Sequence, residues 1–287
     1  MKKGSILALL VLCVSLIHAQ SSSDALNLTF TTIDVPGAVA TDVYGINTAG
    51  EIVGGYTDGS TDHGFLYSNG SFTFFDYPGQ YKTFPFGIND SGLIAGTAYS
   101  NDQVSSVGFL YNGTTFSTIR VGTYVDTTVD GINNASTVVG GYGNFGGNDG
   151  YEMQGTKFKK VTPPNAHTLA YALGINNFGQ IVGTEDNCGF LYNRGRFKTI
   201  DYPSALMTQP WGINDGGIVV GWYEGCSPCA FHGFAYLRGK YMTFDYPGSS
   251  ATFGSGINAS GQIVGIYTLD NITHGFVTTP ISAADFQ

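Results

Sequence analysis

The sequence has little charge: only 11% of its 287 residues are Asp, Glu, Lys or Arg, and the formal net charge is −9. Nucleic acids and anionic membranes are bound by basic surfaces, so this composition argues against both as partners. The chain also lacks a Gly-x-Ser-x-Gly elbow, a phosphate-binding loop and a zinc-protease motif. Without such signatures we predict no catalytic residue and no cofactor.

Cysteines and long apolar runs are also scarce. The one apolar run, residues 6–17, follows Lys2 and Lys3 and ends just before Ala19, which is the pattern of a secretory signal peptide and is too short to span a membrane. We therefore predict a cleaved leader at 1–19, no membrane span, and a secreted or periplasmic protein. An oxidising compartment favours one disulfide, formed across repeats or within the last pair, among the three cysteines that remain: Cys188, Cys226 and Cys229.

What the chain has in abundance is repetition. A Gly-Ile-Asn triplet occurs six times, at intervals of 42, 44, 43, 38 and 44 residues. A period of this length is typical of propeller blades. The triplets begin at Gly45, Gly87, Gly131, Gly174, Gly212 and Gly256.

Each repeat contains four short apolar segments, which the first repeat places at 43–46, 52–56, 64–67 and 72–76. They are β-branched or aromatic and are bounded by turn residues, as strands are. A segment of the fourth type also opens the mature chain at 30–34, whereas the last repeat lacks one. We therefore predict an all-β fold, a six-bladed β-propeller of four-stranded antiparallel blades, in which the N-terminal strand completes the last blade. The predicted single domain is 20–287, with blades at about 39–77, 81–120, 125–162, 168–202, 206–246 and 251–278 plus 28–35.

The link between the second and third strands varies most among the copies: its flanking glycines are 6 to 12 residues apart. Such loops on a rigid scaffold are common carriers of binding residues. In a meander propeller they share a face with the crossovers between blades. This face collects tyrosines and carboxylates, which suit stacking on sugar rings and accepting hydrogen bonds from hydroxyls. The candidate ligand-binding residues are Tyr56, Tyr142, Tyr223 and Tyr267 after the second strands, and Tyr77, Tyr202, Tyr246, Asp34, Asp76, Asp201 and Asp245 at the crossovers.

The same residues have a structural interpretation. Asp-Tyr-Pro-Gly is a turn sequence, and tyrosines beside a strand can pack between blades. Three histidines, His63, His232 and His274, each precede a Gly-Phe pair and raise the question of a metal site. Because the equivalent positions in the other repeats hold Val107, Asp149 and Cys188, we predict that no metal is bound.

Three sub-motifs recur in fixed order, as in Gly87–Gly96, His63–Tyr67 and Phe30–Gly37. Together they resemble a bacterial extracellular repeat family named for a His-Ala-Phe triplet, the HAF repeat. The resemblance covers essentially the whole mature chain, with Gly in place of Ala and with the His present in half of the copies. It implies an exported bacterial protein with a propeller-like fold and no established activity, so it supplies no catalytic residues.

Our first hypothesis is a secreted, monomeric, non-enzymatic binding or scaffold protein whose variable loops bind a glycan or a cell-surface protein. The alternatives are a polysaccharide-acting enzyme, a hydrolase or a lyase, with acidic residues near the central opening, and a purely structural protein-interaction module. Fold alone does not choose among them. Equivalent residues repeated around a ring favour multivalent binding over catalysis.

Overall fold

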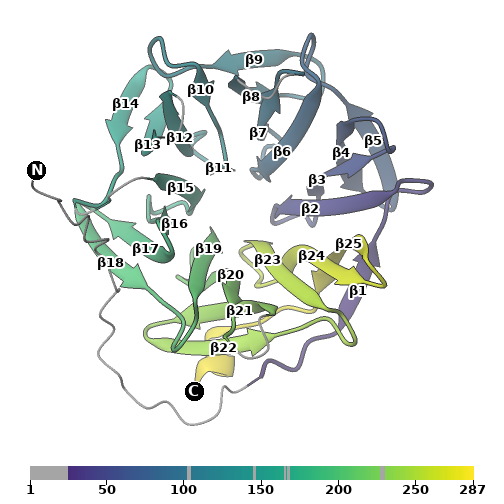
Figure 1. The fold of residues 1–287 in the computed structure, drawn as a ribbon, viewed down its shortest axis with the longest axis vertical. Coiled ribbons are helices and arrows are strands. Elements are labelled where there is room, and N and C mark those ends of the chain that lie inside the picture. Colours follow the sequence, from purple (N-terminus) through teal and green to yellow (C-terminus); the bar gives the residue numbers. More distant parts are fainter. Residues whose placement is uncertain (1–24, 102–104, 145–146, 165, 167–168, 227–229) are drawn as a thin grey trace, which may run out of the picture.

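The computed structural model describes residues 25–101, 105–144, 147–164, 166, 169–226 and 230–287. Its strands are arranged in a ring of sheets around a central axis (Figure 1). Apart from one 3-10 helix, η1 (Ala283–Phe286), all described elements are strands, which confirms the predicted all-β class. No helix in these ranges has the length and hydropathy needed to cross a bilayer.

Three sheets are four-stranded antiparallel meanders of consecutive strands. The first contains β2 (Ala40–Ile46), β3 (Ile52–Thr57), β4 (Asp62–Ser68) and β5 (Ser71–Phe75). The second contains β6 (Lys82–Ile88), β7 (Ile94–Tyr99), β8 (Ser106–Tyr111) and β9 (Phe116–Ile119). The third contains β15 (Ala170–Ile175), β16 (Ile181–Glu185), β17 (Cys188–Asn193) and β18 (Arg196–Ile200).

A fourth sheet differs because its inner strand is split in two. Short strands β10 (Asp126–Thr127) and β11 (Gly131–Ile132) both pair with β12 (Val138–Asn144), which continues to β13 (Gly147–Gln154) and β14 (Lys157–Lys160). Between the two short strands, the Thr128 hydroxyl accepts the Gly141 N–H at 2.8 Å and donates to the Asp130 carboxylate at 2.8 Å. These side-chain bonds occupy the interruption in the ladder.

The fifth sheet has eight strands, so the prediction of six separate four-stranded sheets is confirmed only in part. It contains β19 (Met207–Ile213), β20 (Val219–Glu224), β21 (Phe231–Leu237), β22 (Lys240–Phe244), β23 (Ala251–Ile257), β24 (Ile263–Leu269), β25 (Ile272–Thr278) and β1 (Phe30–Ile33). Its two halves are joined by one parallel pair, Phe231 with Ala251. Phe231 also packs on Phe253, with ring centroids 5.3 Å apart, and this contact holds the halves together.

The chain ends meet in this sheet. Strand β1 pairs antiparallel with β25, from Phe30 opposite Thr278 to Ile33 opposite Gly275, as predicted for the opening strand. Just before β1, the Leu26 N–H donates to the Thr243 carbonyl at 2.9 Å, so the N-terminal segment covers the edge of β22. An edge strand covered in this way offers less of its backbone to other chains.

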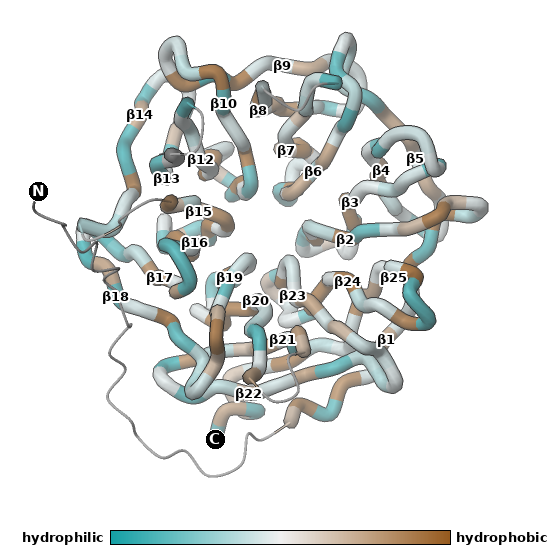
Figure 2. Tube along the Cα trace, in the orientation of Figure 1, coloured by the Kyte–Doolittle hydropathy of each residue, from teal (hydrophilic) through white to brown (hydrophobic). Residues whose placement is uncertain are grey.

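The apolar core lies between neighbouring sheets, and apolar and polar residues alternate along the strands (Figure 2). The aromatic residue after the third-strand glycine is fully buried in each repeat and is the centre of each inter-sheet cluster. These residues are Phe65, Phe109, Tyr151, Phe190, Phe234 and Phe276. The packing fixes the inner strands around the axis and thereby shapes the central channel.

Candidate functional site

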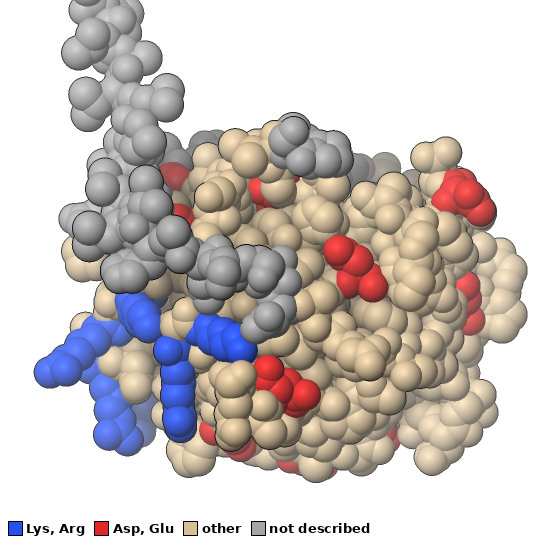
Figure 3. Space-filling view, turned by 90° about the horizontal axis from the view of Figure 1, so that it is seen from below, with Lys and Arg blue, Asp and Glu red and all other residues tan. Residues whose placement is uncertain are grey.

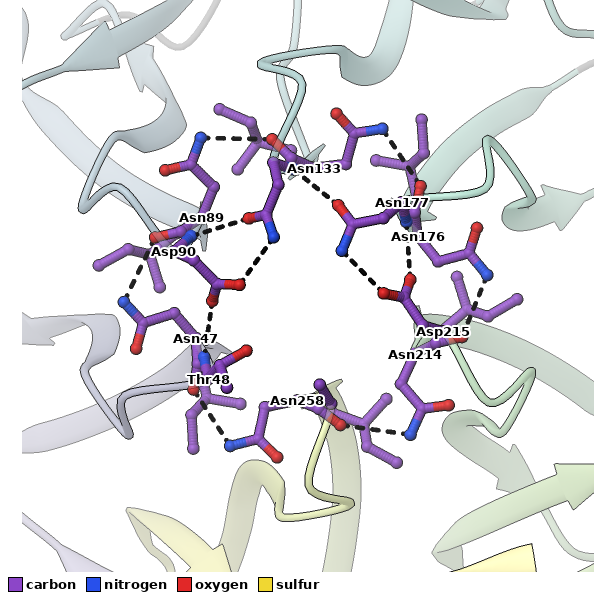
Figure 4. Close-up of a pocket in the computed structure, with 18 residues that line it drawn as sticks. Asn47, Thr48, Asn89, Asp90, Asn133, Asn176, Asn177, Asn214, Asp215 and Asn258 are labelled. Carbon is purple, nitrogen blue, oxygen red and sulfur yellow. Dashed lines mark hydrogen bonds between the residues drawn. The ribbon is translucent and has the colours of Figure 1, made fainter.

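One end of the central channel is lined by a ring of the six asparagines of the Gly-Ile-Asn triplets (Figure 4). Each side-chain Nδ2 donates to the backbone carbonyl oxygen of the asparagine in the next repeat. The distances are 3.3 Å for Asn47 to Asn89 and Asn89 to Asn133, 3.1 Å for Asn133 to Asn176 and Asn176 to Asn214, 3.2 Å for Asn214 to Asn258, and 3.1 Å for Asn258 to Asn47. This asparagine ring connects the last repeat to the first.

Each of these asparagines also shapes its own turn. In the fifth repeat, Asn214 Oδ1 accepts the Ile218 N–H at 3.0 Å, and its backbone carbonyl accepts the Gly217 N–H at 3.0 Å. The second bond confirms the tight turn that the Asn and Gly spacing predicts. Sequence analysis missed the bond between repeats, although the invariance of asparagine at all six positions was its signal.

A second polar layer lies beside the asparagine ring. Asp90 accepts the Thr48 N–H at 2.9 Å and the Asn134 side-chain amide at 2.7 Å, and Asp215 accepts both the N–H and the amide of Asn177 at 2.8 and 2.9 Å. Burial acts to raise the pKa of Asp90, but these hydrogen bonds outweigh it and lower the pKa. The space here is about 80 Å³. The hydrogen bonds of Asp90 and Asp215 join the turns of neighbouring repeats at this end of the channel.

The middle of the channel is narrow because the inner strands meet at glycines. A Cβ on Gly256 would lie 2.7 Å from the Tyr44 carbonyl oxygen, so the strands of the last and first repeats could not approach each other if a larger residue stood there. The six isoleucines of the triplets line this part, from Ile46 to Ile257. They separate the asparagine ring from the opposite end.

That opposite end widens into an aromatic cavity of about 480 Å³, which we call the funnel. Side chains of the inner strands point alternately between the sheets and toward the channel, and the second set forms the walls of the cavity. On β2, Thr41 and Val43 are buried between sheets, whereas Asp42 and Tyr44 lie on the channel side and are half-buried. The residues that line the cavity are Tyr44, Lys82, Phe84, Phe86, Tyr99 and Trp211. Because Lys82 begins β6 and Tyr99 ends β7, the funnel opens on the face of the crossovers and second-to-third-strand loops.

The channel layer next to the funnel differs from repeat to repeat, unlike the asparagine ring, and three of its residues, Tyr44, Phe86 and Trp211, also line the funnel. The residue just before each Gly-Ile-Asn lines the upper channel, and its identities are Tyr44, Phe86, Asp130, Leu173, Trp211 and Ser255. Sequence analysis missed this layer because it compared loop lengths, whereas these positions vary in identity at constant spacing. Variation inside an otherwise invariant motif was the available signal.

The aromatic side chains of the funnel contact one another in a connected group. Ring centroids are 4.9 Å apart for Tyr44 and Phe86, 5.9 Å for Phe84 and Tyr99, and 6.2 Å for Phe86 and Trp211. The Trp211 Nε1–H is buried and has no hydrogen-bond partner within the described ranges. A buried donor without a partner is costly.

Carboxylates stand among these rings. Burial, and after it the charge of Asp62, raises the pKa of Asp42 to about 6, and a hydrogen bond with Tyr44 opposes the shift. Burial raises the pKa of Asp130 to about 7, opposed by the hydrogen bond from Thr128. Asp62 itself pairs with Lys82 at 2.7 Å. Two carboxyl groups of the funnel are therefore desolvated and lack a cationic partner within the described ranges.

The predicted tyrosine face is present, but its rings pack on one another. The crossover residue Tyr202 stacks on Tyr223 with centroids 3.7 Å apart and an interplanar angle of 3°, and both hydroxyls lie within hydrogen-bond distance of Thr243 Oγ1, at 2.7 and 3.2 Å. Tyr246 and Tyr267 repeat the arrangement at 3.5 Å and 3°. These four rings cover each other's faces.

The three remaining candidate tyrosines also contact aromatic neighbours. Tyr142 is 8% exposed and lies against Phe158, Tyr56 packs on Phe74 with centroids 5.0 Å apart, and Tyr77 packs on Phe116 at 5.2 Å. The seven tyrosines therefore contribute to packing between and within sheets, which agrees with the structural interpretation of the sequence.

Three of the four candidate aspartates pair with the three histidines. The distance from His Nδ1 to the carboxylate is 2.9 Å for His63 with Asp76, 2.9 Å for His232 with Asp245, and 2.8 Å for His274 with Asp34. The fourth, Asp201, accepts from Thr208 at 3.2 Å, and burial raises its pKa. Sequence analysis missed these pairs, although a spacing of 13 residues in two repeats was a signal. Within the described ranges, no three His, Cys, Asp or Glu side chains gather as metal ligands.

Two of the three cysteines considered for a disulfide lie within the described residues. Cys188 is buried and disulfide-bonded, and Cys226 is exposed. Cys229 lies outside the described residues. The structure has Cys188 in a disulfide, and the choice between a bridge across repeats and one within the last pair stays a prediction.

Positive charge is concentrated away from the funnel. On the face drawn in Figure 3, Lys and Arg side chains gather at one edge, whereas Asp and Glu are scattered. Half of the twelve Lys and Arg residues lie between 157 and 198, in or beside the outer strands β14 and β18. Among the described residues that line the funnel, Lys82 is the one charged side chain; the carboxyl groups of Asp42 and Asp62 lie near its Tyr44, and that of Asp130 lies near its Tyr99.

Comparison with known proteins identifies the fold. No protein-family model matches the sequence, and no curated protein of similar sequence was found. Among solved structures, the chain is similar to a streptogramin B lyase, with a TM-score of 0.53, 11% identity, and coverage of 89% of this chain and 99% of that one. It is also similar to a putative gluconolactonase (TM-score 0.51, 10% identity, 90% and 94% covered).

A third similar structure is the β-propeller domain of the trilobed protease from Pyrococcus furiosus, with a TM-score of 0.50, 10% identity, and 84% and 93% of the two chains covered. At such low identity these neighbours establish a propeller-type fold and carry no activity to this chain.

Proposed function

We propose that this chain is an exported, non-enzymatic propeller of the HAF repeat type that binds a glycan in its funnel. In this proposal the eight-stranded sheet counts as two blades joined by one residue pair, which gives six blades of four strands, with β1 as the outer strand of the last. The leader-like segment at 1–19 supports export to the periplasm or the cell exterior.

The observation that carries the glycan assignment is the funnel, a cavity of about 480 Å³ with aromatic walls and a buried indole N–H that has no protein partner within the described ranges. Sugar rings present an apolar face that stacks on aromatic side chains and hydroxyl oxygens that accept hydrogen bonds. Tyr44 and Tyr99 add neutral hydroxyls, because burial, with nearby charged groups adding to it, raises the pKa of each. The funnel rings border a cavity, whereas four rings of the tyrosine face stack in parallel pairs.

The test is a broad glycan array probed with residues 20–287. The Trp211→Phe variant keeps an aromatic ring and removes the N–H, so we expect roughly fivefold weaker binding with an unchanged melting temperature. The Trp222→Phe variant is the matched control, because Trp222 packs on Phe231 and Phe253 and does not line the cavity.

Three outcomes are informative. Weaker binding in Trp211→Phe alone would support the funnel. Binding that survives this change but is lost in a folded Tyr223→Ala variant would move the site to the variable-loop face. The absence of binding to any glycan would overturn the proposal and favour a scaffold or a protein-binding module.

A second candidate, a polysaccharide-acting hydrolase or lyase, is favoured by one observation: Asp42 and Asp130 are carboxyl groups near the central opening whose pKa values are raised toward neutrality by burial. Such groups can act as general acids. Incubation of the array's best ligand with the protein, followed by product analysis, tests it. Cleavage that disappears in Asp130→Asn would establish an enzyme.

A further inference from the structure

The funnel combines aromatic faces with carboxylates that have no cationic partner in the described structure, and this combination selects for positive charge. We propose that the glycan bound in the funnel carries a protonated amine, as an amino sugar does, and that Asp130 and Asp42 receive this ammonium group among the aromatic rings. The inference rests on the proposed glycan-binding function and specifies its ligand class.

The charge balance of the cavity is the first argument. Lys82 is the one cation in the lining of the cavity, and three carboxyl groups lie close to its tyrosines: Asp42 and Asp62 near Tyr44, and Asp130 near Tyr99. Because Lys82 is engaged with Asp62 at 2.7 Å, it neutralises that residue and leaves the other two uncompensated. The remaining basic side chains are concentrated on the outer strands β14 and β18 (Figure 3). These carboxylates would repel an anionic ligand, whereas a cationic ligand would neutralise them.

The aromatic walls are the second argument. An ammonium group is attracted to the faces of Trp, Tyr and Phe within about 6 Å of the ring centroid, and the attraction is largest where water is excluded. Tyr44, Phe86 and Trp211 lie in the same layer as Asp130, each immediately before its Gly-Ile-Asn triplet. One cation in this layer can therefore contact a carboxylate and an aromatic face together.

Proton linkage gives a second signature. Burial raises the pKa of Asp130 to about 7 and that of Asp42 to about 6, so a fraction of these carboxyl groups is protonated and neutral near pH 7. A bound ammonium favours the ionised form, and binding should release protons.

The groups that face these carboxyls do not supply the missing positive charge. Tyr99 and Tyr151 face Asp130, and burial raises the pKa of both phenols. Tyr44 and Asp62 face Asp42, with Lys82 paired to Asp62. Proton release on binding is therefore assigned to Asp130 and Asp42.

The test compares two oligosaccharides that differ only at nitrogen, a glucosamine tetramer and its fully N-acetylated counterpart, by calorimetry at about pH 5.5, where the sugar amine is already protonated and the two carboxyls are largely neutral, in two buffers of different ionisation enthalpy. We expect the amine form to bind about tenfold more tightly and to release protons, whereas the acetylated form releases none. Added salt should weaken only the amine form.

The Asp130→Asn variant keeps the size of the side chain. It should bind the amine and the acetylated sugar with nearly equal affinity, and its affinity for the acetylated sugar should not fall. If this variant does not fold, Asp42→Asn serves instead, and retention of the full advantage in whichever of them folds overturns the inference. Equal or tighter binding of the acetylated sugar also overturns it and leaves the glycan proposal standing. Failure to bind both test sugars overturns the inference, and failure to bind any sugar on the array overturns the glycan proposal as well.

Discussion

The asparagine ring makes a specific prediction about stability, which we develop for Asn258 because it joins the last repeat to the first. This side chain is 4% exposed. Its Nδ2 donates to the Asn47 carbonyl at 3.1 Å and to Gln262 Oε1 at 3.0 Å, while its Oδ1 accepts the Gln262 N–H at 3.0 Å. The Asn258→Asp change keeps the accepting oxygen and replaces the donor by a second oxygen. It therefore tests the link between repeats and preserves the turn.

The cost can be estimated from these contacts. Gln262 can turn its amide and donate to the new carboxylate, but the Asn47 carbonyl cannot become a donor. The variant thus loses one bond worth about 1 kcal/mol and places two acceptors in contact in a buried site, which adds about 2 kcal/mol. We expect the free energy of unfolding to fall by about 3 kcal/mol at about pH 8, or the melting temperature to fall by on the order of 10 °C.

Acid should reverse this loss. The introduced carboxyl has a folded-state pKa above its unfolded value of about 3.9, because its ionised form is buried against a carbonyl. A group with a raised folded pKa loses stability as the pH rises through that pKa, so the deficit should shrink as the pH falls toward about 5, where the protonated carboxyl can donate to Asn47.

Urea unfolding at both pH values measures the effect, with Asn112→Asp as control. Asn112 is an exposed turn residue whose Oδ1 accepts from the Thr114 and Thr115 N–H groups at 3.0 and 2.8 Å, a role that a carboxylate retains. We expect the control to change stability by less than about 0.5 kcal/mol. Equal costs for the two variants, or a cost for Asn258→Asp that does not depend on pH, would refute the role assigned to the ring.

Two further predictions concern the scaffold. A Cβ on Gly96 would lie 2.3 Å from the Phe84 carbonyl oxygen, so Gly96→Ala should lower the free energy of unfolding by about 3 kcal/mol or more. The control is Gly55→Ala, whose Cβ would have a Phe84 side-chain atom at 3.4 Å as its nearest neighbour. In the same thermal denaturation, this variant should lose less than about 1 kcal/mol. Burial acts to lower the pKa of His63, but Asp76 and Asp58 outweigh it and raise the pKa. The stabilisation by the His63 and Asp76 pair is therefore present below the unfolded pKa of about 6.5 and is lost as the pH rises through the folded pKa. His63→Gln should remove a small, salt-sensitive part of the pH dependence of stability, and an unchanged profile would contradict the pairing.

The scaffold was predictable from the sequence because the repeats are consistent at every level. Glycine and asparagine positions, hairpin spacing and the displaced opening strand together predict a meander propeller, and β1 does pair with β25. The joining of two units into one sheet was not predictable. It depends on a single residue pair, Phe231 with Ala251, whose contact is made in space and leaves no periodic pattern in the sequence.

The candidate site was less predictable, for a physical reason. The tyrosines and aspartates chosen from the sequence lie at the expected strand ends, but the sequence does not indicate which neighbours satisfy them. Tyr246 stacks on Tyr267 across a blade boundary, and His274 reaches Asp34 across a separation of 240 residues. The funnel was overlooked because its residues come from several different repeats and differ in identity, although three of them share the position just before Gly-Ile-Asn.

The two ends of the channel indicate where binding should be sought. Six identical residues on a closed ring can satisfy one another, as the asparagines do, and a fully satisfied ring offers a ligand little. A ligand without six-fold symmetry needs unequal contacts, and these occur where the repeats differ, in the layer that holds Asp130 and Trp211. That layer also carries an indole N–H without a hydrogen-bond partner and one carboxyl group, Asp130, without a cationic partner, within the described structure. Positions that are invariant among the repeats therefore belong to the scaffold. At the funnel the repeats keep their spacing but differ in identity, and a ligand bound there would offset the cost of burying the indole N–H and the carboxyl group.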